Sequence, residues 1–303
     1  MIFYYSCNTS GQIEKKSHID KGWIFSYDLS ADDTKHLINL GLDELILEDA
    51  EDYFEVPRFE YEKGNAYFFT RYTVETKDGE LSTAPLLIVI SERYVITVSH
   101  QKPEFLDDFA HNRKDLNITD PVSSLVTIFE KIAYDYTKSI MNIRRTMLKY
   151  FGNVGNISEQ GMKHFVGLES TLADYMSALY PMHGALAATL HNKELKLSDE
   201  HHEELEDLKQ DIIQLIDSSK GVLKTIQNIR SAHGAILTHK LNITIKTLTM
   251  VTIILTIPTM ITGLFGMNTW LPFGSSPVGF LAIVIIIIGL CFAAIWWFKN
   301  NKF

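Results

Sequence analysis

Residues 247–298 read TLTMVTIILTIPTMITGLFGMNTWLPFGSSPVGFLAIVIIIIGLCFAAIWWF, and no Asp, Glu, Lys, Arg or His interrupts these 52 residues. A membrane-spanning helix needs about 20 predominantly apolar residues. The segment therefore has room for two spans, Thr247–Phe265 and Val278–Phe298, with a connection that is too short to be a domain. We expect residues 247–303 to form a transmembrane region in a lipid bilayer.

The remainder of the chain is acidic. The 303 residues include 28 Lys and Arg against 37 Asp and Glu, which gives a formal charge of −9. Because two of the basic residues follow the spans, residues 1–246 carry a net charge of −11. The composition excludes a purely soluble protein, a disordered chain and a basic nucleic-acid binder, so we expect no nucleic-acid partner.

Lysines flank the two spans on their outer ends. Lys240 and Lys246 precede the first span, and Lys299 and Lys302 follow the second. Segments on the cytoplasmic side of membrane spans are generally enriched in Lys and Arg. These four lysines therefore predict that both termini are cytoplasmic. The N-terminal residues lack the basic segment and apolar core of a secretory signal, so we expect a multi-pass protein of the cell (inner) membrane.

The part before the spans divides into a sheet-containing domain and a helical region. Strands are expected at residues 23–27, 66–75, 81–90 and 94–99, within an α/β domain that covers residues 1–117. Asp120-Pro121 predicts a helix start, because Asp accepts from the free amides of the first turn and Pro needs no N–H there. A helical stalk region over residues 118–246 completes an α+β membrane protein.

The third stalk helix, which is expected from about Ser198, carries a regular seam. Its members follow each other at intervals of three and four residues and are Leu205, Leu208, Ile212, Leu215, Ser219, Val222, Ile226, Ile229, His233 and Ile236. This spacing is typical of a coiled-coil stripe that faces a partner helix. The partner is either a second copy or a helix of the same chain. No helix breaker separates the seam from the first span, which favours a bundle of copies around a common axis.

Hydroxyl-bearing and small residues share one face of the first span. They are Asn242, Thr249, Thr252, Thr256, Thr259, Gly263 and Gly266, at intervals of seven, three and four residues. Such a stripe either lines a wet pore or packs against another helix, because small and hydroxyl-bearing residues also promote close helix approach in lipid. Since two spans cannot enclose a channel, a pore requires several copies.

The first span ends in Gly266-Met267-Asn268. Glycine lets a helix end and turn without a Cβ penalty, and Asn offers an uncharged carbonyl oxygen. A ring of such carbonyls would suit Mg²⁺, which retains several waters when it binds. As a bare tripeptide, Gly-Met-Asn is equally compatible with an ordinary loop turn.

These features together resemble the CorA family of Mg²⁺ channels. The resemblance covers essentially the whole chain and includes Leu42–Arg58 (LDELILEDAEDYFEVPR), where Leu-Asp replaces the family's His-Pro. It implies a homopentameric funnel that passes Mg²⁺, with Co²⁺ and Ni²⁺ as further ions, and needs no ATP. It also implies a selectivity filter at Gly266, Met267 and Asn268.

The resemblance further implies roles for individual residues. The implied pore positions are Asn242, Leu248, Thr249, Thr252, Thr256, Thr259 and Gly263. Regulatory Mg²⁺ is expected between neighbouring cytosolic domains, at Asp207 of one copy and at Glu75 and Asp78 of the next; the alternative is an acidic face in contact with water. Lys240, Lys246, Lys299 and Lys302 match a basic collar at the inner end of the pore, or serve topology and lipid head-group contact.

The chain departs from the family pattern in the loop after Asn268. Thr269-Trp270-Leu271-Pro272-Phe273 replaces the family's acidic segment, and the last carboxylate of the chain is Asp217. The missing charge should weaken cation accumulation at the mouth. A proton-coupled Zn²⁺ transporter on the same scaffold and a non-conducting, membrane-anchored coiled coil are the alternatives.

No residue pattern indicates catalysis. The sequence lacks GxGxxG, GxxxxGKS, GxSxG and HExxH, and we expect no enzymatic activity. His201 and His202 are adjacent, so their rings point to different sides of a helix, and we interpret both as solvent-facing.

Overall fold

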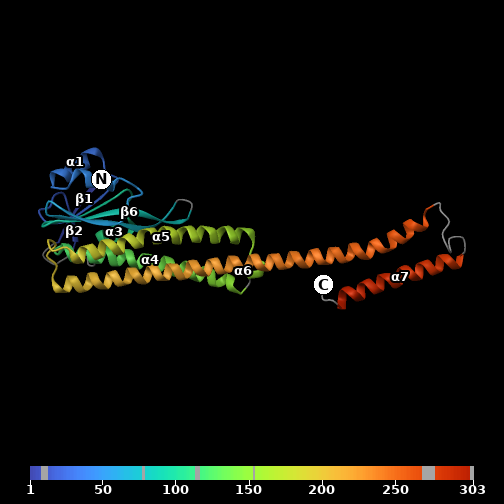
Figure 1. Ribbon diagram of the computed structural model, residues 1–303. Coiled ribbons are helices and arrows are strands. Elements are labelled where there is room, and N and C mark those ends of the chain that lie inside the picture. The colour runs from blue at the N-terminus through green and yellow to red at the C-terminus, as the bar shows by residue number, and fades with distance from the viewer. Residues whose placement is uncertain (8–12, 77–78, 113–116, 153, 268–276, 301–303) are drawn as a thin grey trace. The chain divides into compact units, whose positions relative to one another are not determined.

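The computed structural model describes residues 1–303 except 8–12, 77–78, 113–116, 153, 268–276 and 301–303 (Figure 1). The chain forms two units, Met1–Ile229 and Arg230–Phe303. Asp78, Asn268 and Lys302 lie outside the described residues, as does the segment 269–273.

A seven-stranded sheet organises the first unit, in the order β2-β1-β3-β7-β6-β5-β4. The strands are β1 (Ile2–Cys7), β2 (Ile13–Lys16), β3 (Gly22–Tyr27), β4 (Arg58–Glu62), β5 (Asn65–Glu75), β6 (Leu81–Ile90) and β7 (Tyr94–Ser99). Only β3 and β7 pair in parallel, and the other neighbours are antiparallel. The four strands expected from the sequence are confirmed; β1, β2 and β4 were not predicted.

Helices cover both faces of this sheet (Figure 1). The short helices α1 (Ala31–Asn39) and α2 (Glu44–Ala50) bury one apolar cluster with Ile24, Phe69 and Leu87 of the sheet. On the other face, Phe68 and Ile88 belong to a second cluster with the long helices and with α3 (Glu104–Asn112). The α/β domain therefore has three layers, with the stalk helices as its third layer.

The start of α4 matches the expected cap. Asp120 accepts from the amides of Val122 and Ser123 at the start of α4 (Pro121–Phe151). Ser158 caps α5 (Glu159–His191), and a short 3-10 helix at Val154–Asn156 lies between them. The long helix α6 runs without interruption from Asp199 to Phe265, and α7 covers Pro277–Asn300.

The seam of α6 packs inside its own chain. From Leu205 to Ile229 every seam residue is buried, in one cluster with Ile132 and Ile140 of α4 and Leu172 of α5. The hydroxyl of buried Ser219 donates to the carbonyl of Leu215 at 2.8 Å. The sequence left open whether the seam packs against a second copy or against helices of the same chain. The structure shows helices of the same chain, since α4 and α5 are long enough to cover the seam.

The prediction that both histidines face solvent is wrong for His201. Its Nε2 lies 2.8 Å from Asp120 Oδ2 and 3.3 Å from Ser123 Oγ, so it joins the start of α6 to the cap of α4. Asp120 keeps a lowered pKa: burial opposes the charged form, but the Ser123 hydroxyl and His201 outweigh that effect. His202 is exposed, as expected.

Removing a seam side chain tests the packing of α6. Ile212 is fully buried, so Ile212→Ala should lower the free energy of unfolding by about 2–5 kcal/mol through lost burial and a residual cavity. The exposed neighbour provides a control, and Gln210→Ala should stay within about 0.5 kcal/mol. Thermal unfolding of the full-length protein in detergent, followed by circular dichroism, gives both values. Equal unfolding temperatures for the two variants would contradict the intrachain seam.

Candidate functional site

Two helices in the described part of the chain are long and apolar enough to cross a membrane. They are the C-terminal part of α6 and the helix α7, and they agree with the expected spans. Both belong to the unit Arg230–Phe303.

One face of the first span packs against α7. Ile254, Ile257, Pro258 and Ile261 of α6 are partly covered, and Cys291 Sγ of α7 lies 3.7 Å from the carbonyl oxygen of Ile254. On α7 the less exposed residues follow at intervals of four, four, three and four, namely Ile283, Ile287, Cys291, Ala294 and Phe298. This is the spacing of one helix face, so α7 lies along α6 through an apolar contact.

The hydroxyl and glycine stripe occupies the opposite face of α6. All its residues are exposed in the chain: Asn242, Thr249, Thr252, Thr256, Thr259, Gly263 and Gly266. Leu248, at the edge of the stripe, is exposed as well. At 100° per residue, Thr256 and Ile254 differ by about 160° around the helix. The stripe is therefore free of α7, and within one chain it is not the packing seam between the two spans.

The threonine hydroxyls point their protons at the helix backbone. Thr252 Oγ1 donates to the carbonyl of Leu248 at 2.9 Å, and Thr256 Oγ1 donates to that of Thr252 at 2.7 Å. Thr249 and Thr259 do the same to Ile245 and Leu255. A hydroxyl has one proton and two acceptor lone pairs. Because each hydroxyl proton is donated to the helix backbone, the stripe presents oxygen lone pairs. These lone pairs can accept hydrogen bonds from water or contact a cation.

The helix ends where the sequence predicts. Phe265 is the last helical residue, the Gly266 amide donates to the carbonyl of Thr262 at 3.0 Å, and the Met267 amide donates to that of Leu264 at 3.3 Å. Gly266 and Met267 are exposed. The carbonyl-bearing Asn268 of the expected filter lies outside the described residues.

The stripe and the buried seam take different positions on α6. The seam is buried from Leu205 to Ile229, and the stripe begins farther along the helix, at Asn242. The seam faces α4 and α5, so it cannot also face a common axis. The seam therefore does not supply the contact between copies, and the expectation of a bundle of copies around a common axis stays a prediction.

The expected regulatory carboxylates do not form a metal site in a single chain. Glu75 ends β5, and Asp207 is exposed on α6. Among the residues that the structure describes, no three His, Cys, Asp or Glu side chains gather closely enough to hold a metal ion. Glu75 does line a hollow of about 280 Å³ with Glu104 and Asp135. The sequence analysis did not place Glu104 and Asp135 beside Glu75. No local sequence pattern indicates that β5, α3 and α4 come together there.

The lysines that the sequence suggested for a basic collar lie on both helices of the second unit, as far as the structure describes them. Lys240 and Lys246 are in α6, and Lys299 is in the last turn of α7. Lys220 lies nearer the N-terminal end of α6. Its Nζ lies 3.2 Å from Asp217 Oδ1 and 5.2 Å from the ring centre of Tyr180. Lys220 therefore has partners within its own chain.

Comparison with known proteins places these features in a family. The sequence profile of the CorA-like Mg²⁺ transporter proteins matches residues 22–300. The chain is 24% identical over 288 residues to the Cobalt/magnesium transport protein CorA of Methanocaldococcus jannaschii, a match that covers 92% of this chain and 90% of the relative.

Solved structures share the fold over the full length. The complete structure of the CorA magnesium transporter from Methanocaldococcus jannaschii superposes with a TM-score of 0.85 at 22% identity, over 99% of this chain and 97% of that one. The full-length CmaX protein gives a TM-score of 0.79 at 15% identity, over 100% and 98%. With the profile matching nearly the whole chain, the protein belongs to the CorA-like family of Mg²⁺ transporters.

Proposed function

We propose that several copies of this chain form a passive channel for Mg²⁺, with the stripe of Asn242, Thr249, Thr252, Thr256, Thr259 and Gly263 along a water-filled path. What supports this most is the exposure of the stripe on the face of α6 opposite the face that α7 covers. Polar groups that face lipid have no partners there. Water within a ring of copies supplies those partners.

On the family resemblance we propose five copies, and a ring of five accounts for the rest of the arrangement. The first span of each copy surrounds the path, and α7 separates it from lipid. Leu248 then forms an apolar ring below the threonines, and Lys240, Lys246, Lys299 and Lys302 form the basic collar at the cytoplasmic end. Both termini are cytoplasmic in this arrangement.

The filter is the carbonyl ring of Asn268, which Gly266 and Met267 place at the end of the first span. Uncharged oxygens can hold Mg²⁺ through its water shell without stripping it. Because no carboxylate follows Asp217 in the sequence, the outer mouth concentrates cations less than an acidic loop would. We therefore propose Mg²⁺ as the principal ion, with Co²⁺ and Ni²⁺ also admitted, at a modest rate.

The membrane potential supplies the driving force. A doubly charged ion gains about 4.6 kcal/mol across 100 mV, from roughly 2.3 kcal/mol per charge. Neither ATP nor a proton gradient is then required. Regulation rests on Asp207, Glu75 and Asp78: carboxylates of adjacent copies would share a Mg²⁺ ion that relieves their repulsion.

Flux into proteoliposomes tests the proposed conduction. Mg²⁺ uptake should follow an imposed inside-negative potential and should be unchanged by a pH gradient. Asn268→Ala should abolish selective uptake, because the filter oxygens are lost, whereas Asn300→Ala, at the last residue of α7, serves as the matched control. A Mg²⁺-sensitive dye reports the flux. Uptake only with a proton gradient would favour the Zn²⁺-type transporter, and wild-type flux in Asn268→Ala would remove the filter.

Thiol labelling tests whether the stripe is wet. In a chain whose Cys7 and Cys291 are replaced by Ala, a hydrophilic thiol reagent should modify Thr252→Cys, Thr256→Cys and Thr259→Cys. Ile285→Cys is the control, since Ile285 is exposed on the side of α7 that faces away from α6. It should stay unmodified in lipid. Protection of all three threonine positions would favour the dry, non-conducting coiled-coil assembly.

A charge reversal tests the proposed gate. Asp207→Lys should make the channel less sensitive to closure by cytosolic Mg²⁺, because the lysine cannot help to bind the bridging ion. Gln210→Lys adds the same side chain one turn away and should keep normal sensitivity. Patch recordings at stepped cytosolic Mg²⁺ concentrations measure both. Identical inhibition curves for Asp207→Lys and the wild type would refute the assignment of Asp207.

A further inference from the structure

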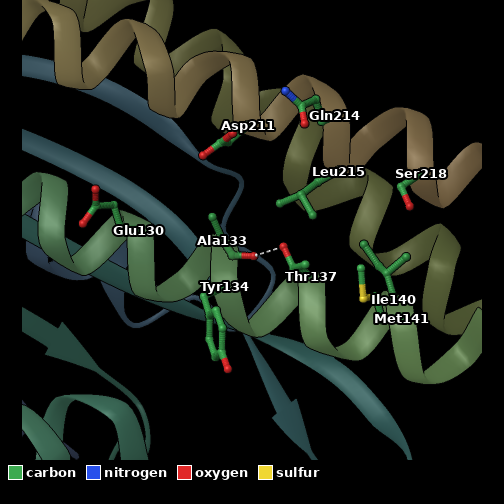
Figure 2. Close-up of a pocket in the computed structure, with 10 residues that line it drawn as sticks. All are labelled: Glu130, Ala133, Tyr134, Thr137, Ile140, Met141, Asp211, Gln214, Leu215 and Ser218. Atoms are coloured by element: carbon green, nitrogen blue, oxygen red, sulfur yellow. Dashed lines mark hydrogen bonds between the residues drawn. The ribbon is translucent and has the colours of Figure 1, made fainter.

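Two hollows of the first unit differ in chemical character. One, of about 590 Å³, lies between α4 and α6, and its charged lining residues are the carboxylates Glu130 and Asp211 (Figure 2). The other, of about 270 Å³, lies over β1, β2 and β3 beside α3, and we call it the aromatic hollow. Its described lining includes the lysines Lys15 and Lys102 against one aspartate, a net charge of +1 within an acidic chain. The aromatic hollow therefore favours an anion.

The pairing of β1 with β3 gathers four aromatic side chains on one face of the sheet. Phe3 lies opposite Phe25, and because side chains alternate along a strand, Tyr5 and Tyr27 share that face. All four line the aromatic hollow, and the rings of Phe3 and Tyr27 stack with their centres 5.7 Å apart. Aromatic walls of this kind pack well against another flat ring.

Two phenol hydroxyls in the hollow are unused. Tyr5 is only 7% exposed, yet neither its hydroxyl nor that of Tyr27 has a hydrogen-bond partner in the part of the chain that the structure describes. Burial and the nearby Asp107 carboxylate raise the pKa of Tyr5, so its hydroxyl keeps its proton. A polar group on a buried side chain costs free energy when it lacks a partner. A ligand with hydrogen-bond acceptors would supply one.

The two lysines come from different elements and are both exposed, at the edge of the hollow. Lys15 of β2 lies opposite Tyr5, and its Nζ is 4.2 Å from the ring centre of Phe3. Lys15 forms no ion pair within the described residues. Lys102, just before α3, lies 2.7 Å from Asp107 Oδ1. At least the Lys15 ammonium group is thus available to an anionic group of a ligand.

Size and chemistry together narrow the class of ligand. A volume of about 270 Å³ is just below the range of roughly 300–1,000 Å³ that is usual for small-molecule sites. The hollow therefore takes little more than one flat ring system, and the anionic group remains at the edge. Lysine ammonium groups bind phosphate through charge-assisted hydrogen bonds. A flat base with acceptor nitrogens and a separate phosphate meets all of these conditions.

We propose that the aromatic hollow binds a nucleoside monophosphate. The base packs against the aromatic rings, and its ring nitrogens accept from the hydroxyls of Tyr5 and Tyr27. The phosphate binds at the edge, to Lys15 and Lys102. The ligand is bound and released unchanged, so it supplies no energy for transport. The site uses no residue of the proposed ion path and does not depend on an assembly of copies.

Calorimetric titration of the full-length protein in lipid nanodiscs, at a fixed Mg²⁺ concentration, tests this site. AMP should bind saturably, once per chain. Adenosine and inorganic phosphate should each bind at least about tenfold more weakly, because each lacks one of the two recognised parts.

Two variants separate the site from general charge attraction. Lys15→Glu should weaken AMP binding at least about tenfold, because it places a negative charge beside the phosphate. Lys16→Glu is the matched control: Lys16 is the next residue, points to the other face of β2 and pairs with Glu14 at 3.2 Å. It makes the same charge change and should alter the affinity by less than about twofold.

Tyr5→Phe keeps the ring and removes only the unpartnered hydroxyl. It should leave the unfolding temperature unchanged and weaken AMP binding by about fivefold. Equal losses in Lys15→Glu and Lys16→Glu, phosphate binding as tight as AMP binding, or no saturable AMP binding to the folded wild type would each overturn the proposal. The proposed channel is tested separately by flux and is unaffected by these results.

Discussion

A bilayer offers no hydrogen-bond partners to polar side chains, and this constraint governs how α6 must be used. The first span presents hydroxyl groups and glycines along one face and aliphatic side chains along the rest. The aliphatic side toward Ile254 is covered by α7, so the polar face needs either water or another chain. The remaining features of the proposed mechanism follow if water contacts that polar face.

The same helix performs two tasks along different parts of its length. Its seam from Leu205 to Ile229 is buried against α4 and α5, and the same helix continues as the first span. The stripe from Asn242 to Gly266 faces the proposed path. Both the seam and the stripe belong to α6, which is one uninterrupted helix of 67 residues.

Much of this arrangement is readable from local sequence signals. The uncharged segment predicts the two spans, the Asp120 cap predicts the start of α4, and the spacing of Leu205–Ile229 predicts the buried seam that the structure shows. The sequence does not predict which helices pack against the seam, because heptad spacing does not distinguish α4 and α5 of the same chain from a second copy. The His201–Asp120 contact spans 81 residues, and the strands β1, β2 and β4 depend on long-range pairing, so local patterns do not reveal them. The filter and regulatory residues stay predictions.

A density map of the wild-type protein in lipid nanodiscs, viewed along its symmetry axis, tests the central claim most directly. The account predicts identical copies around a water-filled centre, with Thr252, Thr256 and Thr259 of every first span turned toward the axis and α7 on the lipid side. A single copy, or threonine faces packed against lipid or against α7, would contradict it.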